Sequence, residues 1–296
     1  MDLLLFTNLL NGLLMTAIPI GLGFYLTRRF RLGWRLWWIG AATFVLSQIG
    51  HIPFNWLLTR LFQSGVLPLP PATWRLVFYA VVLGLSAGLW EELTRYAVYR
   101  WWAKDARSWN KGVLMGAGHG GIEAIIFGLL FLYTFMNMVA LRNTDLAQVV
   151  PASQLALAQQ QVSAYWSSPW LLSILGAVER SFTIPCQIAF SVLVLQAFTR
   201  GKFRWVWLAV LWHAILDASA VYLLGVWAAY PWALYAIEGV IGVAALISLA
   251  IIFALRQPEP EPAAPEEMAP LPAPVNVPVL IPIEETFENL NKTRYN

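Results

Sequence analysis

Long apolar runs separated by short polar connections make up most of the chain between residues 4 and 255. Seven of these runs reach the roughly 20 residues that an α-helix needs to cross the hydrocarbon core of a bilayer. They lie near 4–26, 36–59, 75–99, 112–139, 170–198, 205–227 and 231–255. The pattern predicts an all-α fold, a polytopic integral membrane bundle of about seven transmembrane helices.

Composition supports the same class. The 296 residues are 59% hydrophobic and only 12% charged, and the mean hydropathy is +0.61. A soluble protein would carry about a quarter of its residues charged. The net charge of +3 does not indicate nucleic-acid binding, because the basic residues lie in short connections. The single cysteine, Cys186, excludes an intrachain disulfide and a cysteine-based zinc site.

Lysine and arginine cluster in alternate connections, after the first, third, fifth and seventh apolar runs. Cytoplasmic loops carry such an excess of basic residues. The pattern predicts a multi-pass cell-membrane protein with its N-terminus outside and its C-terminus in the cytoplasm. The first run is long and follows no basic segment, so we expect it to be retained as a span.

Two segments differ from the spans. Residues 145–168 are rich in Gln and Ala with apolar residues at helical spacing, which predicts a short amphipathic helix on the outer surface. Residues 257–296 are rich in Pro and Glu, a composition that cannot bury a core. We therefore predict a transmembrane domain over residues 1–256, followed by a disordered cytoplasmic tail over residues 257–296.

Charged residues interrupt the third apolar run at Glu91, Glu92 and Arg95. A charge at the centre of a bilayer costs about 2.5–3.5 kcal/mol on insertion scales. Offsets of three and four residues place Arg95 on the same helical face as both carboxylates. The cluster therefore needs either an internal ion pair or a functional reason to be there.

Two further runs carry a histidine and a carboxylate one helical turn apart. These pairs are His119 with Glu123, within a run of four glycines, and His213 with Asp217. Glycines at these positions let a neighbouring helix or a substrate backbone approach closely, and we expect water to enter along this wall.

Depth along the helices predicts which polar residues meet. Counted inward from the basic loops at 1.5 Å per residue, Glu91, Glu92, His119 and His213 lie roughly 12–14 Å deep. By the same count Glu123, Asp217 and Gln187 lie in a second layer just beyond.

Other polar positions are expected to serve structure. Glu179 and Arg180 lie about 30 Å deep by the same count, apart from the other polar residues. His51 and Asn55 flank Pro53, which favours a local kink satisfied by polar side chains.

A carboxylate beside a histidine in a desolvated pocket can take a proton from water and make it a nucleophile for a carbonyl carbon. Arg95 would pair with one carboxylate and leave the other as the base. His213, oriented by Asp217, would donate to the oxyanion.

The rival chemistry uses a metal. Zinc accepts two histidines with one or two carboxylates. His119 and His213 with Glu91 or Glu92, and Glu123, could supply this set, but the compact His-Glu-x-x-His motif is absent. The cofactor prediction is therefore none or zinc.

Three motifs in order resemble the YhfC family, within the clan of CAAX prenyl endopeptidases, PrsW-like proteases and ABI proteins. They are Glu91-Glu-x-x-Arg95, Gly118-His-Gly-Gly-x-Glu123 and His213-x-x-x-Asp217, with Glu179-Arg180 between the second and the third. The resemblance covers roughly residues 4–255 and implies an intramembrane protease of glutamate or metallo type.

The resemblance also implies roles for single residues. Glu91 and His119 would activate water, His213 and Asp217 would form the oxyanion site, and Glu92 and Arg95 would support them. The chain departs from the pattern at two positions: Asp217 stands where the prenyl endopeptidases have Asn, and Gln187 stands where YhfC-like sequences have His.

The predicted function is hydrolysis of a peptide bond within the lipid bilayer. The predicted partners are a membrane-associated protein or peptide substrate and the bilayer itself, and no nucleic-acid partner is expected. Two alternatives remain from other classes. One is a proton-coupled carrier that uses the same buried groups as a relay. Against it, the sequence shows no polar path to the outer face and no pair of broken spans. The other is a non-catalytic membrane scaffold of the same fold.

Overall fold

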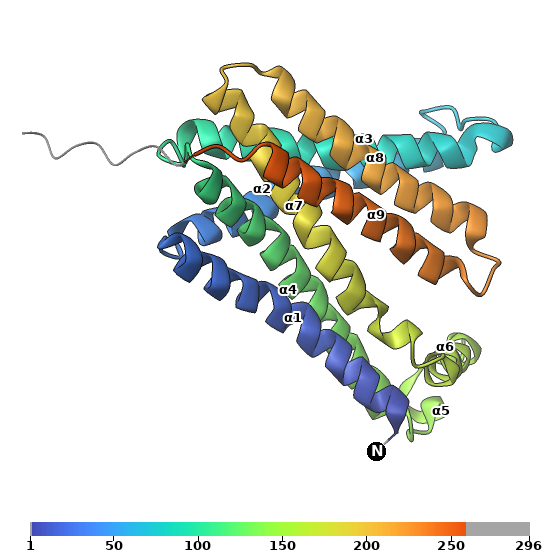
Figure 1. Cartoon of the computed structure of the whole chain (residues 1–296). Coiled ribbons are helices and arrows are strands. Elements are labelled where there is room, and N and C mark those ends of the chain that lie inside the picture. The colour runs from blue at the N-terminus through green and yellow to red at the C-terminus, as the bar shows by residue number, and fades with distance from the viewer. Residues whose placement is uncertain (1, 259–296) are drawn as a thin grey trace, which may run out of the picture. The chain divides into compact units, whose positions relative to one another are not determined.

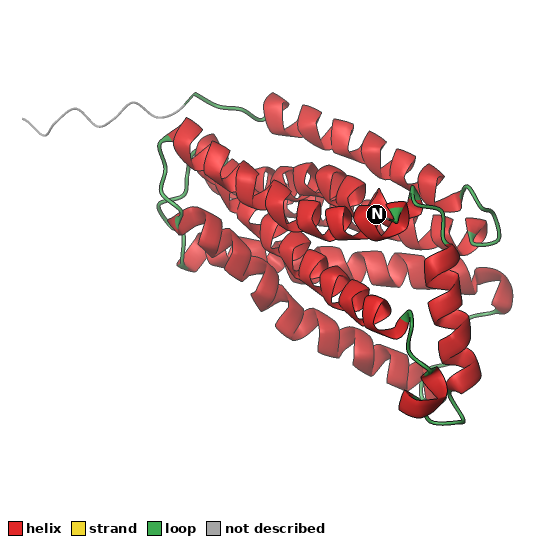
Figure 2. Ribbon diagram, turned by 90° about the horizontal axis from the view of Figure 1, so that it is seen from below, coloured by secondary structure: helices red, strands yellow, loops and turns green. Residues whose placement is uncertain are grey.

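The computed structural model describes residues 2–258. Each predicted span contains one long helix, joined to the next by short loops (Figures 1 and 2). The long helices are α1 (Leu3–Phe30), α2 (Arg35–Gln63), α3 (Ala72–Trp101), α4 (Trp109–Leu141), α7 (Leu175–Thr199), α8 (Arg204–Trp227) and α9 (Ala233–Ala254). The predicted tail, apart from residues 257 and 258, lies outside the described residues, so its prediction is not tested.

Within the described part, six helices are long and apolar enough to cross a membrane. They are α1, α3, α4, α8, α9 and the segment Leu172–Thr199, which consists of a 3₁₀ turn, η1 (Leu172–Ile174), and α7. The predicted fold class, a polytopic helical membrane bundle, is confirmed. The remaining predicted span forms α2, which has 29 residues but is not among the six. Its polar residues Gln48, His51 and Asn55 lower its hydropathy. Gln48 and Asn55 form hydrogen bonds to α3, and His51 bonds to both of them within α2.

Contacts at one end of the bundle bring the basic connections together. Arg35 at the start of α2 donates two hydrogen bonds to Asp105 between α3 and α4, at 2.8 and 3.2 Å, and lowers the pKa of that carboxyl. Trp109 at the start of α4 donates to the Ile252 carbonyl near the end of α9 at 2.8 Å. These helices therefore alternate in direction as predicted. The orientation relative to the two sides of the membrane stays a prediction.

The opposite end carries the predicted helix between the fourth and fifth spans. It consists of α5 (Leu146–Val149) and α6 (Leu155–Ser167), followed by a 3₁₀ turn, η1 (Leu172–Ile174). Arg142 at the end of α4 pairs with Asp2 at 2.6 Å and lies over the Trp166 ring at 4.3 Å. No residue of α6 is buried, as expected of a surface helix.

The largest apolar core lies in the half of the bundle nearest the basic connections. It draws buried residues from the first turns of α2 and α4 and the last turns of α3 and α7, including Trp37, Tyr99, Leu114 and Leu195. Toward the other end, α1, α4 and α7 run in one direction and α3, α8 and α9 in another, so the two groups diverge (Figure 1). The polar residues lie where this core ends.

Candidate active site

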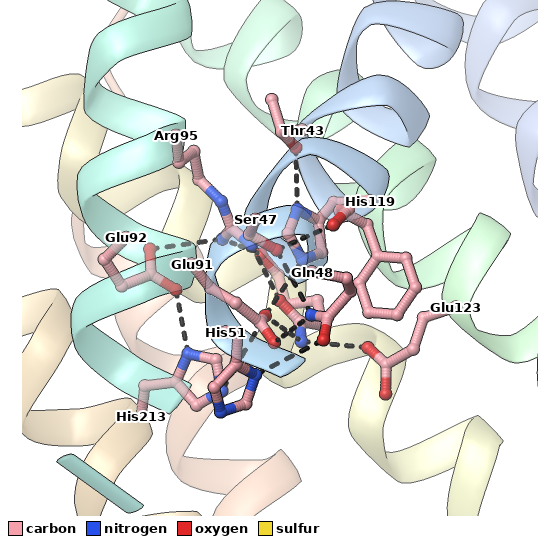
Figure 3. A network of polar contacts seen from close by, with 12 residues as sticks. Thr43, Ser47, Gln48, His51, Glu91, Glu92, Arg95, His119, Glu123 and His213 are labelled. Carbon is pink, nitrogen blue, oxygen red and sulfur yellow. Dashed lines mark hydrogen bonds and ion pairs between the residues drawn. The ribbon is translucent and has the colours of Figure 1, made fainter. Parts of the chain in front are cut away.

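The four residues predicted to share one layer do meet. Glu91 and Glu92 on α3, His119 on α4 and His213 on α8 point toward one another (Figure 3). All four are buried, with Glu92 and His119 fully enclosed. Their positions along three helices of alternating direction explain this meeting, because each lies a similar number of residues from the same end of the bundle.

Glu91 and His119 form one pair. His119 Nε2 lies 3.0 Å from Glu91 Oε2, and its Nδ1 lies 2.7 Å from the Thr43 hydroxyl on α2. With a partner on each nitrogen, the ring is fixed in its plane. Phe44 also meets the ring edge-on, with centroids 5.4 Å apart. The carboxylate and the imidazole are therefore held ready to exchange a proton.

Glu92 has different partners. Its Oε1 accepts from His213 Nδ1 at 2.9 Å, and Arg95 Nη1 lies 3.5 Å from its Oε2. Phe190 stacks on the His213 ring at 4.5 Å. The two adjacent carboxylates thus divide as expected, one with His119 and the other with an arginine.

One prediction about His213 is wrong in its local geometry. Asp217 was expected to orient the ring, but its Oδ2 lies 3.6 Å from Nε2, beyond hydrogen-bonding distance, and its side chain is 39% exposed. Glu92 is the nearer partner because α3 packs against α8 there: a Cβ on Gly88 would meet the Val210 carbonyl oxygen at 2.6 Å. A contact between helices is therefore shorter than the one along α8.

The separation predicted for Glu179 and Arg180 is also wrong. Arg180 Nη1 lies 2.7 Å from Glu123 Oε1, and Arg180 also pairs with Glu179. Gln187 Nε2 donates to Glu123 Oε2 at 3.0 Å and lies 3.4 Å from Glu91 Oε2. The long arginine side chain spans the difference in depth. A continuous polar chain therefore runs from Glu91 to Glu179.

Gln187 also accepts from Arg95. Arg95 donates to the Gln187 side-chain oxygen at 2.7 Å and to its carbonyl oxygen at 3.0 Å. Gln187 thus links the buried arginine to the two carboxylates. Its amide oxygen accepts from Arg95, and its amide nitrogen faces Glu91 and Glu123.

Sequence reasoning missed the contribution of α2. Gln48 Nε2 donates to Glu91 Oε1 at 3.2 Å, and its Oε1 lies 3.3 Å from His51 Nδ1. Asn55 Nδ2 lies 2.8 Å from His51 Nε2 and its Oδ1 accepts from Ser86 at 2.7 Å. The residues assigned to a kink at Pro53 therefore form a hydrogen-bonded relay to Glu91. Their spacing of three and four residues, on one helical face, was the available signal.

The glycine-rich wall is closed, contrary to the expectation of water entry there. A Cβ on Gly118 would collide with the Trp37 carbonyl of α2, and one on Gly120 would lie 2.8 Å from the Gln187 side chain of α7. The glycines serve close helix packing. A cavity of about 130 Å³ lies instead on the other side of Glu91, lined by residues of α3, α4, α7, α8 and α9.

One group of described residues could hold a metal ion. Glu91, Glu92 and His213 each offer a ligand atom within 4.8 Å of the others. Two carboxylates and one imidazole suit an open zinc site, and Glu92 Oε2 has no hydrogen-bond donor. The residues therefore fit a metal. All three were candidate ligands from the sequence, but the group leaves out His119 and Glu123, which are held by Thr43 and Arg180.

Comparison with known proteins agrees with this architecture. The family model described as YhfC intramembrane metalloprotease matches residues 14–251, a range that includes every residue of the site. The chain is 29% identical over 220 residues to the "Uncharacterized membrane protein YhfC" of Bacillus subtilis (strain 168), covering 72% of this chain and 82% of that protein. No solved structure matches. The chain belongs to the YhfC intramembrane metalloprotease family.

Proposed function

We propose that the protein is an intramembrane endopeptidase in which Glu91 and His119 activate a water molecule. The observation that carries the proposal is the buried Glu91–His119 pair, 3.0 Å apart, beside a polar cavity that is also lined by His213. The family description as a protease supports hydrolysis. The membrane-embedded setting implies a membrane-associated protein or peptide as substrate.

The chemistry follows from the positions of these groups. A water in the cavity beside Glu91 loses a proton to the Glu91–His119 pair while its oxygen attacks the carbonyl carbon of the scissile bond. The carbon–nitrogen bond then breaks, and the same pair returns the proton to the leaving amine. Exclusion of bulk water strengthens the electrostatic interactions in the site.

His213 serves the developing oxyanion. Glu92 accepts from its Nδ1, so an imidazolium at this position presents Nε2–H toward the cavity. Arg95 pairs with Glu92, and Gln187 lies beside Glu91. Asp217 lies 3.6 Å from His213 Nε2 and is the second residue proposed for the oxyanion side.

A metal at Glu91, Glu92 and His213 would polarise the carbonyl or a bound water. Whether the purified protein holds one is decided by its metal content. If these residues are the ligands, wild-type protein contains about one zinc per chain by mass spectrometry, and Glu92→Gln loses it while His119→Ala retains it. Equal metal content in all three variants would remove this ligand set.

One observation favours a second candidate function. The polar chain from Glu91 through Gln187, Glu123 and Arg180 to Glu179 supplies the path that the carrier hypothesis lacked at the sequence level. Proton flux into liposomes carrying the purified protein, absent in Glu91→Gln and Glu123→Gln, would support the carrier.

Membrane terminomics tests the protease. New protein N- and C-termini are compared in cells carrying wild type, Glu91→Gln, His119→Ala or the loop control Asp145→Asn, at matched expression. The proposal expects termini present with wild type and Asp145→Asn and lost in both site variants. Identical termini in all four, with all four folded, would leave the carrier or the scaffold.

A further inference from the structure

Hydrolysis consumes one water for each bond cut, yet the reacting groups are buried. Two sides of the pair are closed by packing: the wall of α4 fits against α2 and α7, and Thr43 and Phe44 cover the His119 ring. Water must therefore reach Glu91 from another direction.

The cavity beside Glu91 has the size and chemistry for water. Its volume of about 130 Å³ is well above the roughly 10–15 Å³ that a cavity needs to hold one water. Beyond Glu91 and His213 its wall contains Glu123, Glu179 and Asp217, whose carboxylates offer the polar partners that ordered water requires.

Exposure rises steadily from the reacting groups outward. The side chains of His213 and Glu91 are 4% and 8% exposed, and those of Arg180 and Glu123 are 10% and 15%. Those of Glu179 and Asp217 reach 35% and 39%. Among the acidic residues of the cavity wall, Glu179 on α7 and Asp217 on α8 are therefore the most exposed, and they mark the open end of the cavity.

Arg180 braces this wall. It pairs with both Glu123 and Glu179, and its guanidinium lies 5.1 Å from the Phe127 ring centroid. Three carboxylates against this one guanidinium leave the mouth acidic, a lining that favours water and small cations over anions and lipid tails.

We propose that the cavity bounded by Glu123, Glu179, Arg180 and Asp217 is the water inlet of the site, leading from Glu179 and Asp217 to Glu91. Its use for hydrolysis rests on the proposed function, whereas its accessibility to water does not. In this proposal Glu179 and Arg180 line the path by which the water nucleophile reaches Glu91.

Thiol accessibility tests the inlet. In a Cys186→Ser background, Ala220→Cys places a thiol on the cavity wall, with Leu216→Cys as a second wall position. Val243→Cys on α9 is the matched control, because Val243 is 57% exposed on a spanning helix and does not line the cavity. Each variant is reconstituted in liposomes and treated with 2-aminoethyl methanethiosulfonate, a small cation, or 2-sulfonatoethyl methanethiosulfonate, an anion.

The expected result is that a cavity thiol reacts with the cation at least tenfold faster than Val243→Cys does. It should also favour the cation over the anion by at least tenfold relative to a free thiol. The inlet would be overturned if the Ala220→Cys and Leu216→Cys proteins both fold and their thiols react no faster than that of Val243→Cys. Modification at the wall should then reduce Glu91-dependent cleavage at least tenfold and leave the Val243→Cys protein active. Labelling without any cleavage by unmodified protein would contradict the proposed function and leave the inlet standing.

Discussion

The two sides of Glu91 differ in kind although one helix, α3, presents the carboxylate to both. On the side of α2 and α4 the space is filled: Gln48 and His119 bond to Glu91, Thr43 bonds to His119, and Gly118 lies against the Trp37 backbone. On the side of α7, α8 and α9 lies a cavity of about 130 Å³ bordered by carboxylates.

This difference separates two requirements of hydrolysis. The packed side fixes the position of the proposed base, because Gln48 and His119 bond to Glu91 and Thr43 bonds to His119. In the proposed mechanism the hollow side would admit water and the scissile carbonyl. Changes on the packed side should therefore alter geometry or stability, and changes on the hollow side should alter access.

The largest effect is expected where the two sides meet. Glu91→Gln keeps the size of the side chain but removes its ability to take a proton, so cleavage should fall about 10²–10⁴-fold. Thermal unfolding in detergent should change little. Retention of a tenth or more of wild-type cleavage by a folded Glu91→Gln protein would contradict the assignment of the base.

On the packed side, Gly118→Ala should destabilise the fold. The added Cβ collides with the Trp37 carbonyl, and overpacking of this kind costs about 1–3 kcal/mol. Gly239→Ala on α9 is the matched control, because nothing lies within 4 Å of a Cβ there. If detergent unfolding of both variants matched wild type, the wall would not be packed as described.

The α2 relay should have an intermediate effect. Gln48→Ala removes the hydrogen bond to Glu91 Oε1, and loss of a hydrogen bond to a charged group corresponds to about 1.5–3 kcal/mol. We expect kcat to fall about tenfold or more with KM unchanged, because Gln48 positions the base and does not line the cavity. A rise in KM alone would indicate a role in substrate binding. Gln48→Glu, which keeps the shape but places a second carboxylate beside Glu91, should not restore the rate.

Asp217→Asn should have the smallest effect, within about threefold in kcat. Its carboxylate lies 3.6 Å from His213 Nε2 and is 39% exposed, and pairs that water can reach contribute little. Glu92→Gln, which alters the 2.9 Å partner of the same ring, should reduce kcat more. The reverse order would restore Asp217 as the residue that orients His213.

Much of the arrangement was predictable because it depends on period and length. Apolar runs located the long helices, and the constant rise of an α-helix brought Glu91, His119 and His213 to one level. The partner of His213 was not predictable, because spacing along α8 does not reveal how closely α3 approaches. Glu179 and Arg180 were misplaced because a count along a helix ignores the reach of an arginine.

The role of α2 was missed for a different reason. Pro53 offered a sufficient local explanation for His51 and Asn55, so their helical spacing with Gln48 was not used. The glycines of α4 carried two meanings, close packing or open access, and only the position of Trp37 and Gln187 against them decides for packing.

The most direct measurement is cleavage by purified protein reconstituted in liposomes, on a membrane peptide that carries a site found by terminomics, with products identified by mass spectrometry. The account predicts that wild type and Gly239→Ala cut the peptide at that site and that Glu91→Gln and His119→Ala do not. Equal cutting by wild type and a folded Glu91→Gln protein would contradict it, as would intact peptide with a folded wild type.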